Sequence, residues 1–388
     1  MNLLAQHNTA MMRRLGVVLL AGVLGLLTVP VAPAANYVVA WGDNSSGQTN
    51  VPVGLSNVVS VAAGSLQSLA LRADGTVIGW GDASASTPPE GLSNVVAIAA
   101  GDRQNLALKT DGTVVAWGSP YYPILTNVPA GLSNVVAIGC GDDHNLVLKG
   151  NGTVFAWGVN YSRQTNIPSD LSNVVAIVAG NTGNLAIRRD GTVWGSRFMS
   201  NIVAGFSNVV AGAVVASGSE QGALIQSDGT AVAWYSTVYP NVAFTNTPGV
   251  IAGAGCSASN QAGELFGLRR DGTLVALEPK YTLGPTNIYK SLSNVLALAV
   301  GFTHHLAIVG DGLPIPPTVL ANPVHGSNHF SIQQPTLRGR SYFLEFKSSP
   351  NDPHWQMLPP VPGDGTVQTL IDPNPASPQR IYRVRVAP

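Results

Sequence analysis

The sequence predicts an all-β fold assembled from seven copies of one unit of about 40 residues. The turn dipeptide Asp-Gly, once replaced by Asn-Gly, recurs at intervals of 37 to 43 residues, at positions 74, 111, 151, 190, 228, 271 and 311. One aromatic position recurs with the same period, occupied by Trp41, Trp80, Trp117, Trp157, Trp194 and Trp234, with Leu277 in its place once. No stretch shows a sustained helical period, so the copies are units of β structure.

Residues 93–118 are the most regular copy and show how one unit folds. An apolar run at 94–100 predicts a first strand, an alternating run at 105–109 predicts a second, and the β-branched and aromatic run at 113–117 predicts a third. Asp111-Gly112 predicts the tight turn between the last two strands, because this pair adopts positive φ at little cost. A Gly- and Pro-bearing loop, with room for a short fourth strand, leads to the next copy. We interpret the recurring Trp as packing between copies.

Small twisted sheets bury both faces only against their neighbours, which favours the blades of a β-propeller. After residue 312 the chain continues as LPIPP without a third strand, whereas residues 36–42, NYVVAWG, supply that strand at the other end. We therefore predict a seven-bladed propeller over 35–312 with split-blade closure, in which residues 38–41 pair with residues 304–309. A β-solenoid is the alternative, although solenoids usually repeat at shorter periods.

The segments outside the repeats predict export and a second, smaller module. Residues 1–34 combine Arg13-Arg14, an apolar run and the small-residue pattern Ala32-Pro33-Ala34, which is the layout of a cleaved signal peptide. The apolar run is shorter than a membrane span, so we expect no span after cleavage and a secreted, periplasmic or cell-surface location. Residues 313–317 predict a stiff linker. Residues 318–388 predict a small β-sandwich-like module, which resembles fibronectin-type or related modules of exported bacterial proteins.

Charge argues against a nucleic-acid partner. Only 10% of the residues are charged, and the formal net charge is zero. Residues 35–312 carry 12 basic and 16 acidic side chains, and residues 313–388 carry 6 and 4. No basic stripe is present that could neutralise phosphates, so we expect no nucleic acid among the partners.

Three segments carry a family resemblance: AWGDNSSGQTNVP, VVAIAAGDRQNLALKTDGTVVAWG and VVAIGCGDDHNLVLKGNGTVFAWG. They resemble regulator of chromosome condensation repeats, and the resemblance spans about residues 36–312. It implies a seven-bladed propeller closed by a split blade. Nucleotide exchange on a nuclear GTPase is not expected, because the export signal and the acidic ring oppose it. The WGDN and GQT loops are more similar to an exported bacterial branch that includes beta-lactamase inhibitory propellers, which bind proteins through one face and catalyse nothing.

One position departs from the family pattern. Its repeats commonly carry a His before the Leu-Ala-Leu strand. Here that position holds Gln67, Gln104, His144, Gly183, Gln221 and His304, so the His is mostly lost.

Strand direction predicts which segments share one end of the ring. The first strand of each copy runs up to a short turn and the third runs up to the Trp, so the turns and the long loops after the Trp emerge together. Tyr in such loops suits recognition, because it supplies contact area at little entropic cost. The candidate partner-binding residues are the loop aromatics Tyr121, Tyr122, Tyr161, Phe198, Tyr235, Tyr239, Phe244, Tyr281 and Tyr289, joined by Arg103, Asp142, Asp143 and Phe302 from the short turns. The alternative is that these rings only pack beneath their own loops.

Catalytic and metal-binding patterns are weak. Asp142-Asp143-His144 is better interpreted as a polar turn than as a metal site. His304 and His305 are adjacent in a strand, so their rings are expected on opposite faces, where they do not share a metal. We expect a monomeric, non-catalytic recognition scaffold with no cofactor, which binds a protein or glycan through the loop face. A structural or adhesive surface component and a polysaccharide-acting enzyme are the alternatives left open.

Overall fold

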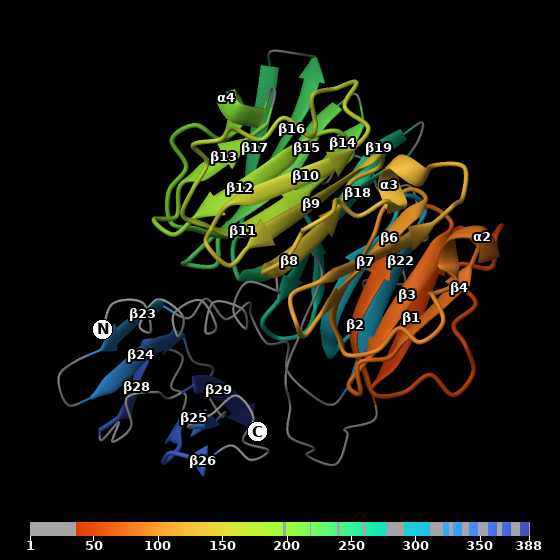
Figure 1. Ribbon diagram of the computed structural model, residues 1–388. Coiled ribbons are helices and arrows are strands. Elements are labelled where there is room, and N and C mark those ends of the chain that lie inside the picture. The colour runs from red at the N-terminus through yellow and green to blue at the C-terminus, as the bar shows by residue number, and fades with distance from the viewer. Residues whose placement is uncertain are drawn as a thin grey trace. The chain divides into compact units, whose positions relative to one another are not determined.

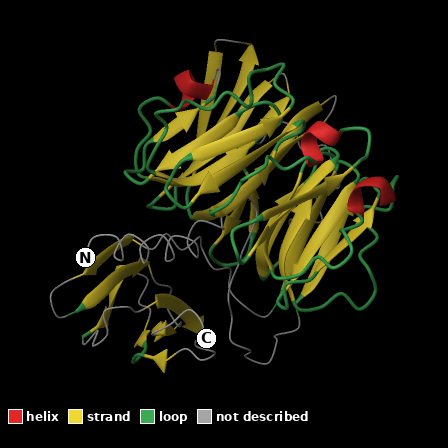
Figure 2. Cartoon of the chain, viewed as in Figure 1, coloured by secondary structure: helices red, strands yellow, loops and turns green. Residues whose placement is uncertain are grey.

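Short antiparallel sheets account for nearly all of the regular structure (Figure 2). The computed structural model describes residues 36–196, 199–217, 219–238, 241–258, 261–277, 291–310, 321–325, 329–335, 341–347, 356–362, 367–373 and 381–387. The signal peptide predicted at 1–34 and the linker predicted at 313–317 lie outside these residues. The prediction of an all-β fold is confirmed.

Seven small sheets occupy the described residues between 36 and 310. The first four are β2–β3–β4 (Val58–Ala63, Gln67–Arg72, Val77–Gly81), β5–β6–β7 (Val95–Ala100, Gln104–Lys109, Val114–Gly118), β8–β9–β10 (Val135–Cys140, His144–Lys149, Val154–Gly158) and β11–β12–β13 (Val174–Ala179, Asn184–Arg188, Val193–Gly195). The next two are β14–β15–β16–β17 (Val209–Ser217, Ser219–Gln226, Ala231–Val238, Asn241–Thr247) and β18–β19–β20 (Val250–Ala258, Gln261–Arg269, Leu274–Ala276). The seventh joins β21 (Val295–Val300) and β22 (His304–Val309) to β1 (Tyr37–Gly42).

The burial of each strand follows its place in the sheet. The middle strand β6 is buried at every position except the last, because it lies between two strands and between two neighbouring sheets. The third strand β7 buries Val114 and Trp117 and leaves the residues between them half-buried. The hydrophobic clusters span neighbouring sheets: Trp117 packs with Leu69 of the preceding sheet. The core is therefore a series of layers between sheets, as the recurring Trp predicts.

The predicted pairing of residues 38–41 with residues 304–309 is confirmed. β1 pairs antiparallel with β22, and the register runs from Tyr37 opposite Val309 to Gly42 opposite His304 (Figure 1). The first strands of successive sheets contact one another in the order β2, β5, β8, β11, β14, β18 and β21, and β21 contacts β2 again. These strands line a central cavity of about 120 Å³, mostly with Ala, Gly and Val, together with Leu298 and the thiol of Cys140.

Repeated hydrogen bonds hold each sheet to the next at the end that carries the Asp-Gly hairpins. The amide of Val135 donates to the carbonyl of Gly112 in the preceding sheet at 3.0 Å. Asn134, which precedes that valine, has a φ of 59°, and its own carbonyl accepts from the amide of Gly150. Asn tolerates this left-handed conformation, so the Ser-Asn-Val motif that recurs along the chain marks the point where a sheet begins.

Departures from the regular unit lie in the connections and in the later sheets. Three single-turn helices occur within the described long loops: α2 (Ala83–Ser86), α3 (Pro123–Thr126) and α4 (Met199–Val203) (Figure 2). They are too short to produce a helical period in the sequence. Among the described residues between 36 and 310, the β14–β17 sheet has four strands. The chain after Trp234 extends β16 and then returns as β17.

The described residues beyond 320 form two further sheets. One contains β23 (Ala321–His325), β24 (Phe330–Pro335) and β28 (Val367–Asp372). The other contains β25 (Ser341–Lys347), β26 (Gln356–Met357), β27 (Val361–Pro362) and β29 (Ile381–Ala387). A common cluster of buried side chains joins both: Phe330, Ile332, Tyr342, Leu344, Phe346 and Leu370. No helix in the described part of the chain is long and apolar enough to span a membrane.

Candidate functional site

The structure confirms which segments share one end of the ring. The residue that follows the third strand donates its amide to the turn between the first two strands of the same sheet. Ser119 donates to the carbonyl of Arg103 at 2.9 Å, and Val159 donates to the carbonyl of Asp143 at 2.8 Å. We call this end, with its short turns and long loops, the turn end. The opposite end, with the Asp-Gly hairpins, is the hairpin end.

The long loops are anchored at their bases by buried backbone carbonyls. The carbonyl of Leu125 accepts hydrogen bonds from Asn145 Nδ2 at 2.8 Å and from Trp157 Nε1 at 3.3 Å, both in the next sheet. The carbonyl of Gln48 accepts from Trp80 Nε1 in the same way. Trp80 and Trp157 therefore fix these loops as well as packing in the core, which agrees with a structural role and not with ligand stacking.

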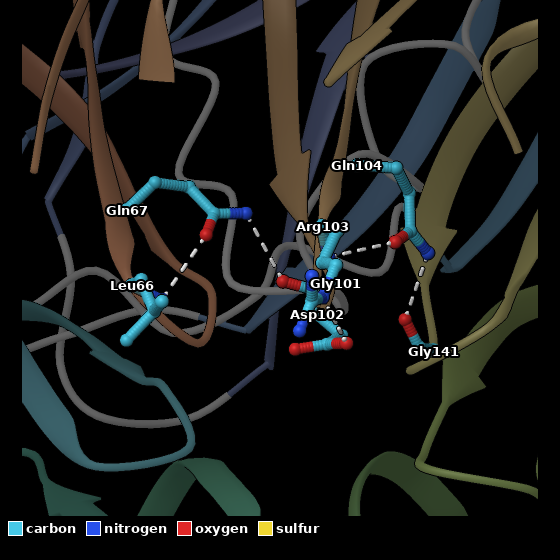
Figure 3. A network of polar contacts seen from close by, with 7 residues as sticks. All are labelled: Leu66, Gln67, Gly101, Asp102, Arg103, Gln104 and Gly141. Carbon is cyan, nitrogen blue, oxygen red and sulfur yellow. Dashed lines mark hydrogen bonds and ion pairs between the residues drawn. The ribbon is translucent and has the colours of Figure 1, made fainter. Parts of the chain in front are cut away.

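At the position where the repeat family commonly carries a His, the side chains of Gln67 and Gln104 link neighbouring sheets (Figure 3). Gln104 Nε2 donates to the carbonyl of Gly141 in the next sheet at 3.0 Å, and Gln104 Oε1 accepts from the amide of Arg103. Gln67 makes the same pair of contacts with Gly101 and Leu66. A buried Gln at this position uses both the nitrogen and the oxygen of its amide in hydrogen bonds. A Gln in place of the His therefore keeps the link between the sheets.

The two retained histidines at this position make the same kind of link with different partners. His144 Nε2 lies 2.7 Å from Asn184 Oδ1, and His304 Nε2 lies 2.8 Å from Ser68 Oγ. Burial lowers the pKa of each ring to about 4, and the neighbouring His305 contributes to the shift at His304. His305 packs instead against Trp41 and Phe266. The adjacent histidines therefore face opposite sides, as predicted.

The tips of two long loops expose aromatic rings at the turn end. Tyr121 is 83% exposed, Tyr161 is 97% exposed, and Tyr122 is 37% exposed. The Arg103 guanidinium lies 5.3 Å from the centre of the Tyr122 ring and 3.3 Å from the Asp102 carboxylate. Tyr122 is thereby held by a cation–π contact, whereas the other two rings extend into solvent.

Two half-buried carboxyl groups lie between these loops. Asp142 and Asp143 form the turn before His144, and the amide of Asp142 donates to the carbonyl of Asn181 at 3.3 Å. Burial raises the pKa of Asp142 to about 8, and the charges of Asp102 and Asp143 add to the effect. Burial also raises the pKa of Asp143, with Asp102 adding to the shift and Arg103 opposing it.

These residues lie on neighbouring segments of the turn end, which together we call the Tyr–Asp face. Arg103 connects the loop that carries the first two tyrosines to the acidic turn, and the carbonyl of Asp143 holds the start of the loop that carries Tyr161. The Tyr–Asp face consists of Asp102, Arg103, Tyr121, Tyr122, Asp142, Asp143 and Tyr161.

The structure places the other candidate residues differently. The placement of Tyr235 and Phe244 in a loop is wrong, because both lie in paired strands, β16 and β17. Phe244 is 49% exposed and packs against Phe206 at the edge of its sheet. Phe302 is half-buried in the turn before His304, away from the acidic turn in sheet order. The remaining four, Phe198, Tyr239, Tyr281 and Tyr289, lie outside the described residues.

Two loops at the turn end share one architecture. In loop 159–167, Asn160 Oδ1 accepts from the amide of Thr165 at 3.0 Å, and Gln164 Oε1 accepts from the amide of Ser162 at 2.8 Å. Loop 43–51 repeats both bonds at the same lengths, with Asn44 and Gln48 as acceptors. This relationship was missed from the sequence, although the shared QTN motif and the Asn four residues before the Gln would have signalled it.

The two loops differ at their tips and in the turns beneath them. Tyr161 replaces Ser45, and Arg163, with a φ of 60°, replaces Gly47. We call loop 159–167 with turn 141–143 the acidic corner, and loop 43–51 with turn 301–303 the neutral corner. Phe302 and Thr303 in the neutral corner stand where the acidic corner has its two aspartates.

The described residues offer no group of three or more His, Cys, Asp or Glu side chains placed to hold a metal ion. In the motif Asp142-Asp143-His144, the His ring is directed into the link with Asn184. The motif is therefore divided between a surface turn and a buried contact.

Comparison with known proteins identifies the repeat. Residues 58–85, 95–122 and 135–164 match the regulator of chromosome condensation (RCC1) repeat. These segments cover the first three sheets and reach into both loops of the Tyr–Asp face. No curated protein matches the sequence.

Solved structures agree on the fold. Prp20p from Saccharomyces cerevisiae is similar with a TM-score of 0.50 at 15% identity, over 79% of this chain and 95% of Prp20p. A chain in the structure of Kap60 bound to yeast RCC1 (Prp20) gives a TM-score of 0.52 at 16% identity, over 79% of this chain and 92% of that one. The described sheets between 36 and 310 thus form an RCC1-like β-propeller, and identities this low show the fold alone.

Proposed function

We propose that this chain, which contains RCC1 repeats, is an exported, non-catalytic recognition protein that binds a protein partner through the Tyr–Asp face. The ring is a seven-bladed propeller with split-blade closure, in agreement with the seven sheets and with the pairing of β1 and β22. Residues 1–34 act as the signal peptide, so the mature protein begins near residue 35 and is secreted, periplasmic or on a bacterial cell surface. Residues 318–388 form an accessory β-module.

The exposure of rings on rigid loops is the observation that carries this proposal. Tyr161 is almost fully exposed on a loop whose internal hydrogen bonds and buried Gln164 fix its backbone. Solvent exposure of such a ring contributes nothing to the core, whereas a ring on a fixed backbone gives contact area with little loss of backbone entropy on binding. Tyr and Arg are also enriched in protein–protein interfaces, which favours a protein partner.

Site-specific photo-crosslinking tests the proposal. A photoreactive phenylalanine analogue replaces Tyr161 in one full-length chain and Tyr37 in another, expressed in the source cells. Tyr37 is a matched control, because it is 54% exposed and lies at the start of β1, at the hairpin end. We expect a protein adduct from position 161 and none from position 37.

The second test measures the affinity of each variant for the protein that was identified in the adduct and then purified. The Tyr121→Ser and Tyr161→Ser variants should each weaken binding about tenfold or more, as for aromatic residues at interface centres, while Tyr37→Ser leaves it unchanged. Equal adducts at both positions, or equal affinities for all three variants, would refute the proposed face. N-terminal sequencing of the mature protein tests export, with residue 35 as the expected start.

A further inference from the structure

The charges of the Tyr–Asp face indicate which side chains a protein partner would present to it. The inference drawn from them rests on the proposed function. We infer that the face receives a basic side chain, an arginine or lysine presented by the protein partner, beside Asp142 and between the exposed tyrosines. The partner's cation occupies the space between the loop of Tyr121 and the loop of Tyr161.

The face holds three carboxyl groups and one cation. The guanidinium of that cation, Arg103, is already engaged, since it lies 3.3 Å from Asp102 and against the ring of Tyr122. Asp142 and Asp143 therefore share no full counter-charge from the side chains described around them. A basic group from outside would balance the charge of this turn.

Of the three carboxyl groups, Asp142 should interact most strongly with such a basic group, because it is partly buried. It is half-buried, and Asp102 and Asp143 both act on it with like charge. A partially desolvated carboxylate interacts more strongly with an entering cation than an exposed one does, because water screens the pair less. The same surroundings raise the pKa of Asp142, so the free protein holds this carboxyl protonated near neutral pH and an entering cation would favour its ionised form.

The neighbouring tyrosines suit an arginine or lysine stem. Arg103 and Tyr122 already show the contact that such a residue makes with a ring in this face. Tyr121 and Tyr161 remain exposed on either side and can cover the methylene groups of a long side chain.

The two ends of the ring also differ in charge. Acidic side chains gather at the turn end: Asp43, Asp82, Asp102, Asp142 and Asp143, against the basic Arg103 and Arg163. Basic side chains lie beside the hairpins (Arg72, Lys109, Lys149, Arg188, Arg189, Arg269 and Arg270), and the hairpin carboxylates Asp74, Asp111, Asp190, Asp228 and Asp271 offset most of their charge. The excess of acidic side chains at the turn end therefore directs a basic partner toward that end.

Selection of peptides tests the inference. The full chain is immobilised and panned with a phage library of random peptides, and the enriched peptides are synthesised with each Arg or Lys intact or replaced by an uncharged analogue, citrulline or norleucine. Affinities are measured by calorimetry for the wild-type chain, Asp142→Asn, Tyr161→Ser and Asp111→Asn. Asp111→Asn is the matched control, because it lies at the hairpin end and the next sheet has Asn151 at the same place.

We expect enriched peptides to carry Arg or Lys and to lose about tenfold to a hundredfold in affinity when that charge is removed, as for a charge-assisted hydrogen bond. The loss should shrink severalfold in Asp142→Asn and persist in Asp111→Asn. Peptides that need Tyr161 but no basic residue would overturn this inference and leave the proposed function standing. If no peptide depends on Tyr161, or if none is enriched, both fail.

Discussion

The acidic and neutral corners of the ring share a scaffold and differ in what they present to solvent. Both loops are fixed by the same Asn and Gln hydrogen bonds, and both rest on a turn followed by a buried His. The acidic corner adds Tyr161 and Asp142, where the neutral corner has Ser45 and Phe302. The repeat thus separates its structural positions from its variable ones, so the exposed residues can change while the loop keeps its shape.

The largest expected effect concerns the His that both corners retain. The pKa of His144 and that of His304 are lowered to about 4, so the folded protein holds both rings neutral while the unfolded chain takes up protons below about pH 6.5. Stability should therefore fall as pH drops from 6.5 to 4, by on the order of 2–3 kcal/mol for each His. Chemical denaturation of wild type, His144→Gln and His304→Gln at pH 7 and pH 4 measures this.

Each Gln variant should lose less stability on acidification than wild type, because Gln67 and Gln104 show that an uncharged amide fits the same link. The carboxyl groups are the same in all three proteins, so the difference in pH dependence reports the His and the charges that interact with it. An identical pH slope in the variants would show that the links are not sensitive to protonation.

The second effect concerns the buried glutamines that hold the loops. Gln48→Ala and Gln164→Ala each remove the acceptor for a loop amide, and each should lower the free energy of unfolding by about 1–3 kcal/mol. Gln48 also donates to Asp43, where the acidic corner has Val159, so Gln48→Ala should cost more. Urea denaturation compares the two. A larger loss for Gln164→Ala would contradict the shared scaffold.

The third effect distinguishes the two turns. The pKa of Asp142 is raised to about 8, so the folded protein binds a proton that the unfolded chain releases near pH 4, and stability falls as pH rises from 4 to 8. Asp142→Asn should remove this loss and raise the melting temperature at pH 8 by about 2–4 °C per kcal/mol recovered. The gain should vanish near pH 4. Phe302→Asn, at the matching place, should show no such pH dependence.

The smallest effect concerns the backbone at the loop tips. Arg163 adopts a φ of 60°, where the neutral corner has Gly47 at 80°. Gly47→Arg should lower stability by about 1 kcal/mol, since side chains are strained in this region, and Arg163→Gly should be neutral or stabilising within about 1 kcal/mol. Thermal unfolding checks both changes. Marked destabilisation by Arg163→Gly would show that the arginine side chain, and not the backbone, holds the loop.

The regular part of the fold could be predicted because its signals repeat. Strands, hairpin turns and ring closure all follow from a period of about 40 residues and from the third strand that is missing at one end and present at the other. The short helices were not predictable, because a single turn leaves no periodic pattern. Tyr235 was misplaced because a long loop and a strand hairpin have similar compositions in this segment.

The candidate site was predicted only in outline. The alternating direction of the strands predicts that the tyrosines of the long loops and the acidic turn lie at the same end of the ring. The structure shows the contacts between these segments. The link at Gln104 reaches the backbone of the next sheet, a contact that depends on the separation of two sheets and is invisible in one sequence. The same holds for the raised pKa of Asp142, which depends on neighbours from other turns.

Closure by the first strand imposes an order on biosynthesis. Tyr37–Gly42 leaves the ribosome long before its partner His304–Val309, and at ordinary translation rates the interval is on the order of ten to fifty seconds. During that time the strand remains an open edge that can pair with other chains. A circularly permuted gene that encodes β1 directly after β22 would shorten this wait and should give a higher yield of correctly closed rings.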